Sequence, residues 1–228
     1  MSGVYGFTHR RSSGVSGGPY AEANLATHVG DLAEAVAENR RRFADRRGVA
    51  SDRVVWMDQV HGAAVAVVDG PRNEPPVADA LVTASPGLVL AVLVADCVPV
   101  VLLGDDVVGV AHAGRRGAAA GVVLRTVEAM RELGATAIDA NLGPAICGDC
   151  YEVPAQMQHE VDTDLPGSAC STRGGTPGLD LRAGLARQLE GLGIATQVSP
   201  TCTAESPHLF SHRRDGVTGR QAAYAMLG

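Results

Sequence analysis

Three residues of this sequence are of types that could do chemistry together: His61, Cys97 and His112. Each stands at or just past the end of an apolar, strand-like segment. Strand ends meet at the edges of a sheet, so we expect the three side chains to converge. Two imidazoles and one thiolate suit Zn²⁺, and three protein ligands leave a fourth position open for water, which is typical of a catalytic zinc site.

Two other interpretations of these residues stay open at this point. Cys97 is also suited to act as a nucleophile, with one of the histidines as its base, in an enzyme without a metal. A buried cysteine that only packs as a small hydrophobic residue, beside two hydrogen-bonded histidines, would need no chemistry at all. The intervals between the three residues match no short zinc motif, so spacing alone does not decide among these interpretations.

Pairs of arginines stand near these segments. Arg115-Arg116 follows His112-Ala113-Gly114, and Arg213-Arg214 lies between His212 and Asp215. Beside a metal, such pairs indicate an anionic substrate group such as phosphate, which arginine binds through two parallel hydrogen bonds. Without a metal, a surface loop that balances its own charges is the simpler interpretation.

A C-x-x-C motif, Cys147 to Cys150, is predicted to lie in a loop and to carry no chemistry, because Cys170 and Cys202 are lone residues and supply no second pair. The sequence has no H-x-E, which excludes the zinc-deaminase signature. It has seven histidines and no H-x-H, which argues against a multicopper oxidase.

Length and composition favour a single domain over residues 1–228, with a core of Val, Leu and Ala, since 46% of the residues are hydrophobic and only 4% aromatic. The net charge of −6, without a basic tail, argues against nucleic acid as a partner. All basic residues are arginine, which excludes P-loop and Schiff-base lysines. We expect a cytoplasmic protein with reduced thiols and no membrane partner, because no signal peptide is apparent and the apolar run 88–95 is too short to span a bilayer.

Apolar periodicity predicts a mixed α/β fold with a sheet core and helices packed outside it. Strands are expected at 53–57, 64–68, 79–83, 88–95, 99–103, 107–112, 138–142 and 195–198. Helices are expected at 31–47, 117–133, 180–192 and 219–227, and loops at 10–20 and 166–178. The first helix ends in an arginine-rich stretch that we interpret as a solvated face.

Ordered segments along nearly the whole chain resemble the YfiH/YlmD laccase-domain family. They are Gly6–Thr8, Gly18–Tyr20, Asn24-Leu25, His28–Gly30, Asn39-Arg40, Gln59–Gly62, Ala78–Ala80, Ala95–Pro99, His112–Gly114, Gly143–Ile146, Tyr151–Val153 and Phe210–Gly216. One departure is visible: Arg115 stands where the family usually has Trp, which could weaken stacking of a base or alter substrate choice.

This resemblance implies an α/β/β/α sandwich related to bacterial toxin cysteine hydrolases. It also implies phosphorolysis of adenosine, inosine, guanosine and methylthioadenosine, together with deamination of adenosine. The expected partners are therefore a nucleoside and phosphate. Some members are named peptidoglycan editing factors, so a hydrolase acting on a cell-wall precursor, with zinc or Cys97 as the catalytic agent, is the alternative. A metal-binding partner of the division machinery is a third, non-enzymatic possibility.

The resemblance also implies a metal site, and the chemistry of the implied reactions points to further residues. Zinc, rather than copper, is expected on His61, Cys97 and His112. Cys97 and its neighbour Asp96 are expected to be catalytic, Asp96 either by orienting a ligand or by moving a proton. Residues expected to bind substrate or phosphate are Arg116, Arg213, Arg214 and Asn24.

Overall fold

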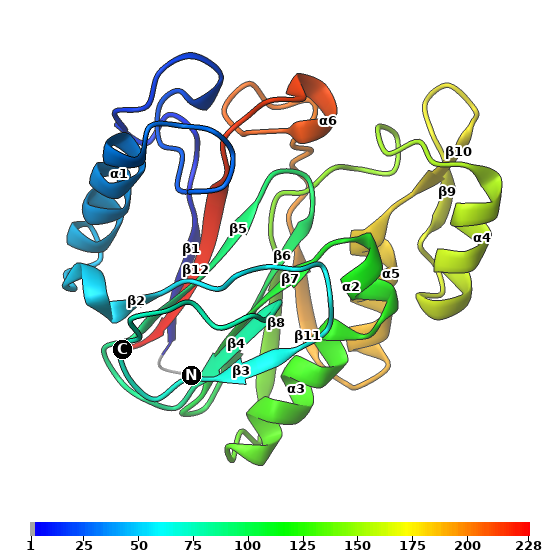
Figure 1. The fold of residues 1–228 in the computed structure, drawn as a ribbon. Coiled ribbons are helices and arrows are strands. Elements are labelled where there is room, and N and C mark those ends of the chain that lie inside the picture. Colours follow the sequence, from blue (N-terminus) through cyan, green and yellow to red (C-terminus); the bar gives the residue numbers. More distant parts are fainter. Residues whose placement is uncertain (1–2) are drawn as a thin grey trace.

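A computed structural model describes residues 3–228, in which two β-sheets lie face to face (Figure 1). The four-stranded sheet has the order β1 (Gly3–Phe7), β12 (Gln221–Leu227), β5 (Val89–Val94) and β2 (Val54–Val55). The six-stranded sheet has the order β11 (Ala195–Val198), β8 (Ile138–Leu142), β6 (Val98–Gly104), β7 (Val108–Ala113), β4 (Ala80–Thr83) and β3 (Val65–Val67). A separate hairpin joins β9 (Ala169–Ser171) to β10 (Pro177–Leu179).

The two sheets share one apolar layer, because alternate residues of each strand point to opposite faces. In β5, Leu90 and Val92 pack toward the six-stranded sheet, whereas Val89 and Ala91 belong to the cluster beneath α1. The six-stranded sheet repeats this pattern. Both faces of the central strands are therefore buried, which explains their nearly continuous apolar sequences.

Helices cover both outer faces of this pair of sheets (Figure 1). On the four-stranded side lies α1 (Ala33–Asp45), and on the six-stranded side lie α2 (Arg115–Ala119), α3 (Val122–Glu132) and α5 (Leu181–Glu190). A further helix, α4 (Ala155–Asp164), packs on β9 and β10, and α6 (His212–Asp215) is a single turn. Short 3₁₀ turns cover Gly18–Tyr20 and Ser51–Arg53. The expected α/β/β/α sandwich is confirmed.

The predicted helix at 219–227 is wrong, because these residues form β12, which pairs with β1 and β5. Both faces of β12 are covered, by the other sheet and by the α1 side, so its apolar residues do not alternate with polar ones and resemble a helix. The predicted helix at 117–133 is two helices, α2 and α3, separated by Gly121 with φ 79°. Neither β1 nor α4 was expected, and the predicted loop at 166–178 contains β9 and part of β10.

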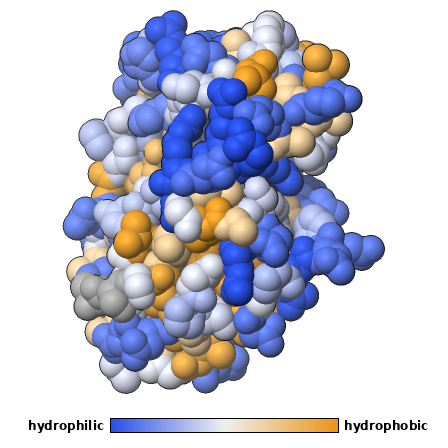
Figure 2. Space-filling view, turned by 90° about the vertical axis from the view of Figure 1, so that its left-hand side faces the viewer, coloured by the Kyte–Doolittle hydropathy of each residue, from blue (hydrophilic) through white to orange (hydrophobic). Residues whose placement is uncertain are grey.

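The arginine-rich end of α1 is only partly solvated. Figure 2 shows this side of the molecule, where strongly hydrophilic residues gather across the middle and hydrophobic ones form small patches. Arg41 is exposed and pairs with Glu38. The guanidinium of Arg40, however, lies 4.3 Å from the ring centroid of Trp56, which follows β2, and that of Arg47 lies 3.7 Å from the ring centroid of Tyr224 in β12. These two arginines bind helix to sheet through cation–π contacts.

From Gly3 onward, no helix combines the length and apolarity that a membrane span requires. The single-domain assignment of residues 1–228 stays a prediction, and its first two residues, Met1 and Ser2, lie outside the described part of the chain.

Candidate functional site

The side chains of His61, Cys97 and His112 meet at one end of the sandwich. Their candidate ligand atoms all lie within 4.8 Å of one another. The two imidazole rings are 4.7 Å apart between centroids and nearly perpendicular, with an interplanar angle of 78°. His112 is buried, Cys97 half-buried and His61 exposed, so the cluster opens to solvent on one side. The convergence expected from the sequence is thus present.

Two of these residues stand where the chain passes from one sheet to the other. His61 lies between β2 of the four-stranded sheet and β3 of the six-stranded sheet, and Cys97 lies between β5 and β6. Both passages contain a non-glycine residue in the left-handed region, His61 with φ 60° and Asp96 with φ 92°. Such conformations cost about 1–3 kcal/mol each and persist where the surroundings hold them.

Asp79, just before β4, holds both histidines. Its Oδ1 accepts a hydrogen bond from the backbone N–H of His61 at 2.9 Å, and its Oδ2 accepts one from Gly62 at 2.6 Å. Oδ1 also lies 2.8 Å from Nδ1 of His112. With Nδ1 donating to this carboxylate, Nε2 of His112 is left to face Cys97 or a metal. Sequence reasoning assigned Asp79 no role: its place before an apolar strand is visible in the sequence, but its contact with His112 is not.

Charge within the cluster favours an ionised thiol. Burial alone would raise the pKa of Cys97, but hydrogen bonds from His112 and His61 outweigh it and lower the pKa to about 6. Burial likewise opposes protonation of His112, but Asp79 and Cys97 outweigh it and raise the pKa of His112 to about 9. The site therefore stabilises a thiolate, which is the form that binds a metal or attacks as a nucleophile.

Gly114 leaves room for the cluster. A Cβ placed there would lie 3.0 Å from Cδ2 of His61 and 3.1 Å from Sγ of Cys97. The absence of a side chain at Gly114 therefore leaves space for the rings and the thiol of the cluster.

The cluster forms the floor of a cavity of about 270 Å³. Three arginines line it, Arg115, Arg213 and Arg220, and their positive charges favour an anionic ligand over a cationic one. Tyr151 lies beneath Arg213, whose guanidinium is 5.1 Å from the ring centroid. Other polar lining residues are Gln59, His28, Asp96 and His212. The candidate metal cluster and several cationic side chains therefore line the same cavity.

Of the four residues expected to bind substrate or phosphate, only Arg213 lines this cavity. Arg116 is exposed and reaches the carbonyl oxygen of Val60 at 3.5 Å. Arg214 pairs with Asp215 at 2.6 Å and donates to three backbone carbonyls, so its guanidinium is occupied by the fold.

Asn24 is fully buried, and it also lies outside the cavity lining. Its Oδ1 accepts the backbone N–H of Arg220 at 2.9 Å, so it holds the segment that presents Arg220 to the cavity.

Asp96 lies in the lining, but hydrogen bonds hold both of its carboxylate oxygens. Oδ1 accepts from Oγ1 of Thr203 at 2.6 Å, and Oδ2 accepts from the backbone N–H of Arg213 at 2.6 Å. Its backbone carbonyl accepts from Ile146 at 3.0 Å. Of the two roles considered for Asp96, these contacts favour orientation over proton transfer.

Sequence reasoning assigned no site role to Arg220, Tyr151, His28 and Gln59. Arg220 precedes a strand that was predicted as a helix, so its place at the cavity could not be inferred. Arg115, noted in the sequence as one of an arginine pair and as a departure from the family pattern, does line the cavity. Burial raises the pKa of Tyr151, and the nearby charge of Arg115 opposes that shift.

Comparison with known proteins places this chain in a family. Residues 4–228 match the family described as "Multi-copper polyphenol oxidoreductase laccase". A purine nucleoside phosphorylase of Streptomyces coelicolor is 54% identical, over 98% of this chain and 95% of that protein. The crystal structure of YlmD from Geobacillus stearothermophilus superposes with a TM-score of 0.91 at 35% identity, covering 100% of this chain and 92% of that one.

A second solved structure, YfiH from Bacillus licheniformis, gives a TM-score of 0.90 at 32% identity, covering 99% of this chain and 93% of that one. Sequence and fold agree over essentially the full length. The chain therefore belongs to the multi-copper polyphenol oxidoreductase laccase family, the laccase-domain family of YlmD and YfiH that its sequence resembles.

Proposed function

We propose that this chain is a zinc-dependent purine nucleoside enzyme. It cleaves adenosine, inosine, guanosine and methylthioadenosine with phosphate, and it deaminates adenosine. The observation that carries this proposal is one cavity that combines a three-residue metal cluster with three arginines. Relatives named purine nucleoside phosphorylase support the choice of substrate class.

The residues present fit a zinc ion. The donor set is two imidazole nitrogens and one thiolate, and Asp79 supports His112 as carboxylates commonly support metal-binding histidines. Zinc is proposed rather than copper because a multicopper oxidase needs further paired histidines, and this sequence has no H-x-H. Bound there, zinc would supply Lewis acidity and a water of lowered pKa, which suits attack on C6 of adenine with loss of ammonia.

The arginines suit phosphorolysis. In that reaction an oxygen of phosphate forms a bond to C1′ of the ribose as the bond from C1′ to the purine nitrogen breaks, and the purine leaves with the electron pair. Arg213 and Arg220 hold the phosphate and place it against the sugar. Asp96 acts as a positioning residue, because it fixes the backbone N–H of Arg213.

Tyr151 and Arg115 provide a flat wall beside the cavity, since both line it and Tyr151 is half-buried. Aromatic rings and guanidinium planes both stack on nucleobases. We propose that the purine lies against this wall, with Arg115 taking the place of the usual Trp.

A second candidate function rests on two successive contacts, one between Asp79 and His112 and one between His112 and Cys97. Asp79 is hydrogen-bonded to His112, and His112 in turn lowers the pKa of Cys97. This is the order of orienting acid, base and nucleophile in metal-free cysteine hydrolases. A hydrolase acting on a peptidoglycan precursor, with Cys97 as its nucleophile, would use the same residues.

Incubation of the purified protein with adenosine, with and without phosphate, tests the proposal. Ribose 1-phosphate and adenine, formed only when phosphate is present, identify the phosphorylase activity, and inosine identifies the deaminase. Both activities should disappear after chelation and return with zinc. Turnover of neither kind by zinc-loaded protein contradicts the proposal, and activity that survives complete removal of metal favours the nucleophile.

A further inference from the structure

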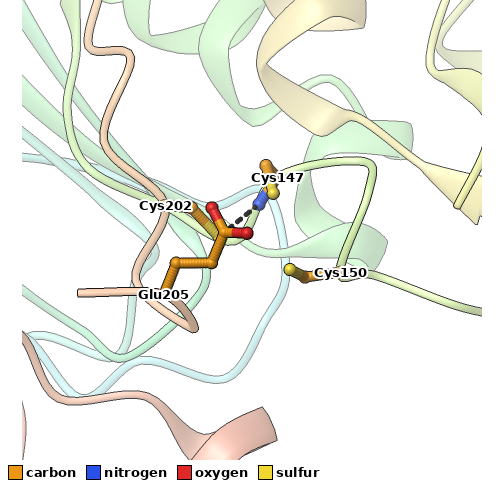
Figure 3. Close-up of side chains that lie close together, drawn as sticks. All are labelled: Cys147, Cys150, Cys202 and Glu205. Atoms are coloured by element: carbon orange, nitrogen blue, oxygen red, sulfur yellow. Dashed lines mark hydrogen bonds between the residues drawn. The ribbon is translucent and has the colours of Figure 1, made fainter. Parts of the chain in front are cut away.

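A second group of side chains that could hold a metal ion contains none of His61, Cys97 and His112 and is drawn in Figure 3. Cys147, Cys150, Cys202 and Glu205 each offer one ligand atom, and these four atoms lie within 4.8 Å of one another. In Figure 3 the carboxylate of Glu205 points toward the cysteines. Cys202 is lone in the sequence, which led to the expectation that the C-x-x-C motif lacks a partner. The fold supplies that partner, so the argument against a metal site fails.

Backbone contacts bring the two segments together. Ala145 pairs with Cys202 in a parallel bridge, and the N–H of Thr203 donates to the carbonyl of Ala145 at 3.0 Å. The N–Hs of Cys150 and Tyr151 both donate to the carbonyl of Cys147, which closes the turn of the motif. The positions of these residues are thus fixed by main-chain hydrogen bonds.

The sulfur of Cys202 accepts a backbone hydrogen bond, as metal-bound thiolates commonly do. The N–H of Cys147 points at Sγ of Cys202 at a distance of 3.3 Å, drawn as the dashed line in Figure 3. Metal-bound groups are usually supported by such hydrogen bonds from the surrounding protein. Glu205 is supported as well, because one of its oxygens accepts from Arg173 at 2.5 Å and the other is left for a metal.

We propose that Cys147, Cys150, Cys202 and Glu205 bind a structural zinc ion in a closed, four-ligand site. Zn–S bonds of about 2.3 Å in a tetrahedral site separate the sulfurs by about 3.8 Å, which the observed cluster accommodates with small side-chain movements. Three thiolates and a carboxylate fill the coordination sphere, so no position remains for substrate. In this respect the site differs from the three-residue cluster at the cavity.

The ion would tie together two walls of the cavity. Ile146 and Tyr151 flank the C-x-x-C motif and line the cavity. Thr203, next to Cys202, donates to the carboxylate of Asp96, which in turn fixes Arg213. A zinc ion between these segments would hold them in register.

Counting zinc per chain in variants tests this proposal. Full-length protein, expressed with added zinc and purified under reducing conditions without chelator, should hold one zinc fewer per chain as Cys150→Ser than as wild type. Cys170→Ser is the matched control: Cys170 is half-buried and close to Gly148, but outside the cluster, so its zinc content should equal the wild type. Equal zinc in wild type and Cys150→Ser overturns the proposal.

Cys97→Ser separates this site from the proposed function. If the cavity cluster also binds zinc, wild type holds two ions and each of the two variants, Cys97→Ser and Cys150→Ser, holds one. If the cavity cluster binds none, Cys97→Ser equals the wild type and the loss in Cys150→Ser remains.

Glu205→Gln keeps the test valid should the cysteine variants not fold. The exposed Glu205 can be replaced without opening the core, and the variant should release one zinc to a colorimetric chelator at least about tenfold faster than wild type. An unchanged release rate contradicts the site. So does a disulfide among Cys147, Cys150 and Cys202, found by mass spectrometry in wild-type protein purified under the same reducing conditions.

Discussion

Oδ1 of Asp79 lies 2.8 Å from Nδ1 of His112, where the carboxylate has 0% and the imidazole 4% of its surface exposed. The same carboxylate accepts the backbone N–H groups of His61 and Gly62. One buried acid thus orients two of the three candidate ligands, one through its ring and the other through its backbone.

Asp79→Asn should weaken zinc binding by about 10- to 100-fold, because an amide cannot accept every hydrogen bond that the carboxylate accepts. Chelator competition on folded protein measures this change. Asp69→Asn, at an exposed position, is the control and should leave zinc affinity as in the wild type. Wild-type affinity in Asp79→Asn would mean that His61 and His112 are held without this acid.

Cys97→Ala should abolish both turnover and zinc binding at the cavity while the chain stays folded, since the large apolar core does not depend on this thiol. Circular dichroism and product assays measure the two effects. Unfolding at room temperature would make the ion structural. Retention of that zinc with loss of activity would favour Cys97 as a nucleophile. His61→Ala and His112→Ala then decide between the two mechanisms: a metal site loses zinc and activity in both variants, whereas a Cys–His pair needs only one histidine as its base.

The metal-free protein should show the ionisation of Cys97 in its stability. The pKa of this thiol falls from its ordinary value of 9.0 to about 6 on folding, so its contribution is fully present above pH 9 and is lost as pH falls through about 6. His112 acts in the opposite sense: its raised pKa contributes below pH 6.5 and is lost as pH rises through about 9. Thermal unfolding of chelator-treated wild type and Cys97→Ser should therefore differ more at pH 8 than at pH 5. An equal difference at both pH values contradicts the thiolate.

Gly114→Ala should reduce zinc affinity with little change in fold, because the added methyl would crowd His61 and Cys97 at about 3 Å. The matched control is Gly17→Ala, since a Cβ at Gly17 meets no atom within 4 Å. Zinc titration compares the two variants. Equal affinities would show that the backbone at residue 114 shifts enough to accommodate the methyl group.

Arg213→Ala should raise the KM for phosphate by about 10- to 100-fold, as expected for a lost charged hydrogen bond of about 1.5–3 kcal/mol. Deamination of adenosine, which uses no phosphate, should keep its kcat. Arg116→Ala is the control, because Arg116 lies outside the cavity lining. An equal effect on both reactions would place Arg213 at the nucleoside instead.

The convergence of His61, Cys97 and His112 could be predicted because the apolar pattern reveals strand ends locally, and Cys97 and His112 do stand at strand ends, whereas His61 lies further along, in the passage between β2 and β3. The role of Asp79 could not be predicted, because its hydrogen bond to His112 depends on the pairing of Ala80 with Ala111, two residues far apart in the sequence. The position of Cys202 beside the C-x-x-C motif could not be predicted for the same reason. The error over 219–227 has another cause: when both faces of a strand are buried, its alternation disappears from the sequence.

Strand β12 lies between β1 and β5, and its pairing joins Leu227 to Gly3. Contacts between residues so distant in the chain form slowly, because the entropy of closing a long loop is lost before the strands gain their hydrogen bonds. The six-stranded sheet, by contrast, contains hairpin neighbours such as β6 and β7. We therefore expect the six-stranded sheet to form early and the other sheet to close late. The passages that carry His61 and Cys97 join the two sheets, so a metal ion at the cavity would bind after this closure. In Cys150→Ser, which lacks the second proposed zinc site, added zinc would therefore leave the refolding rate unchanged.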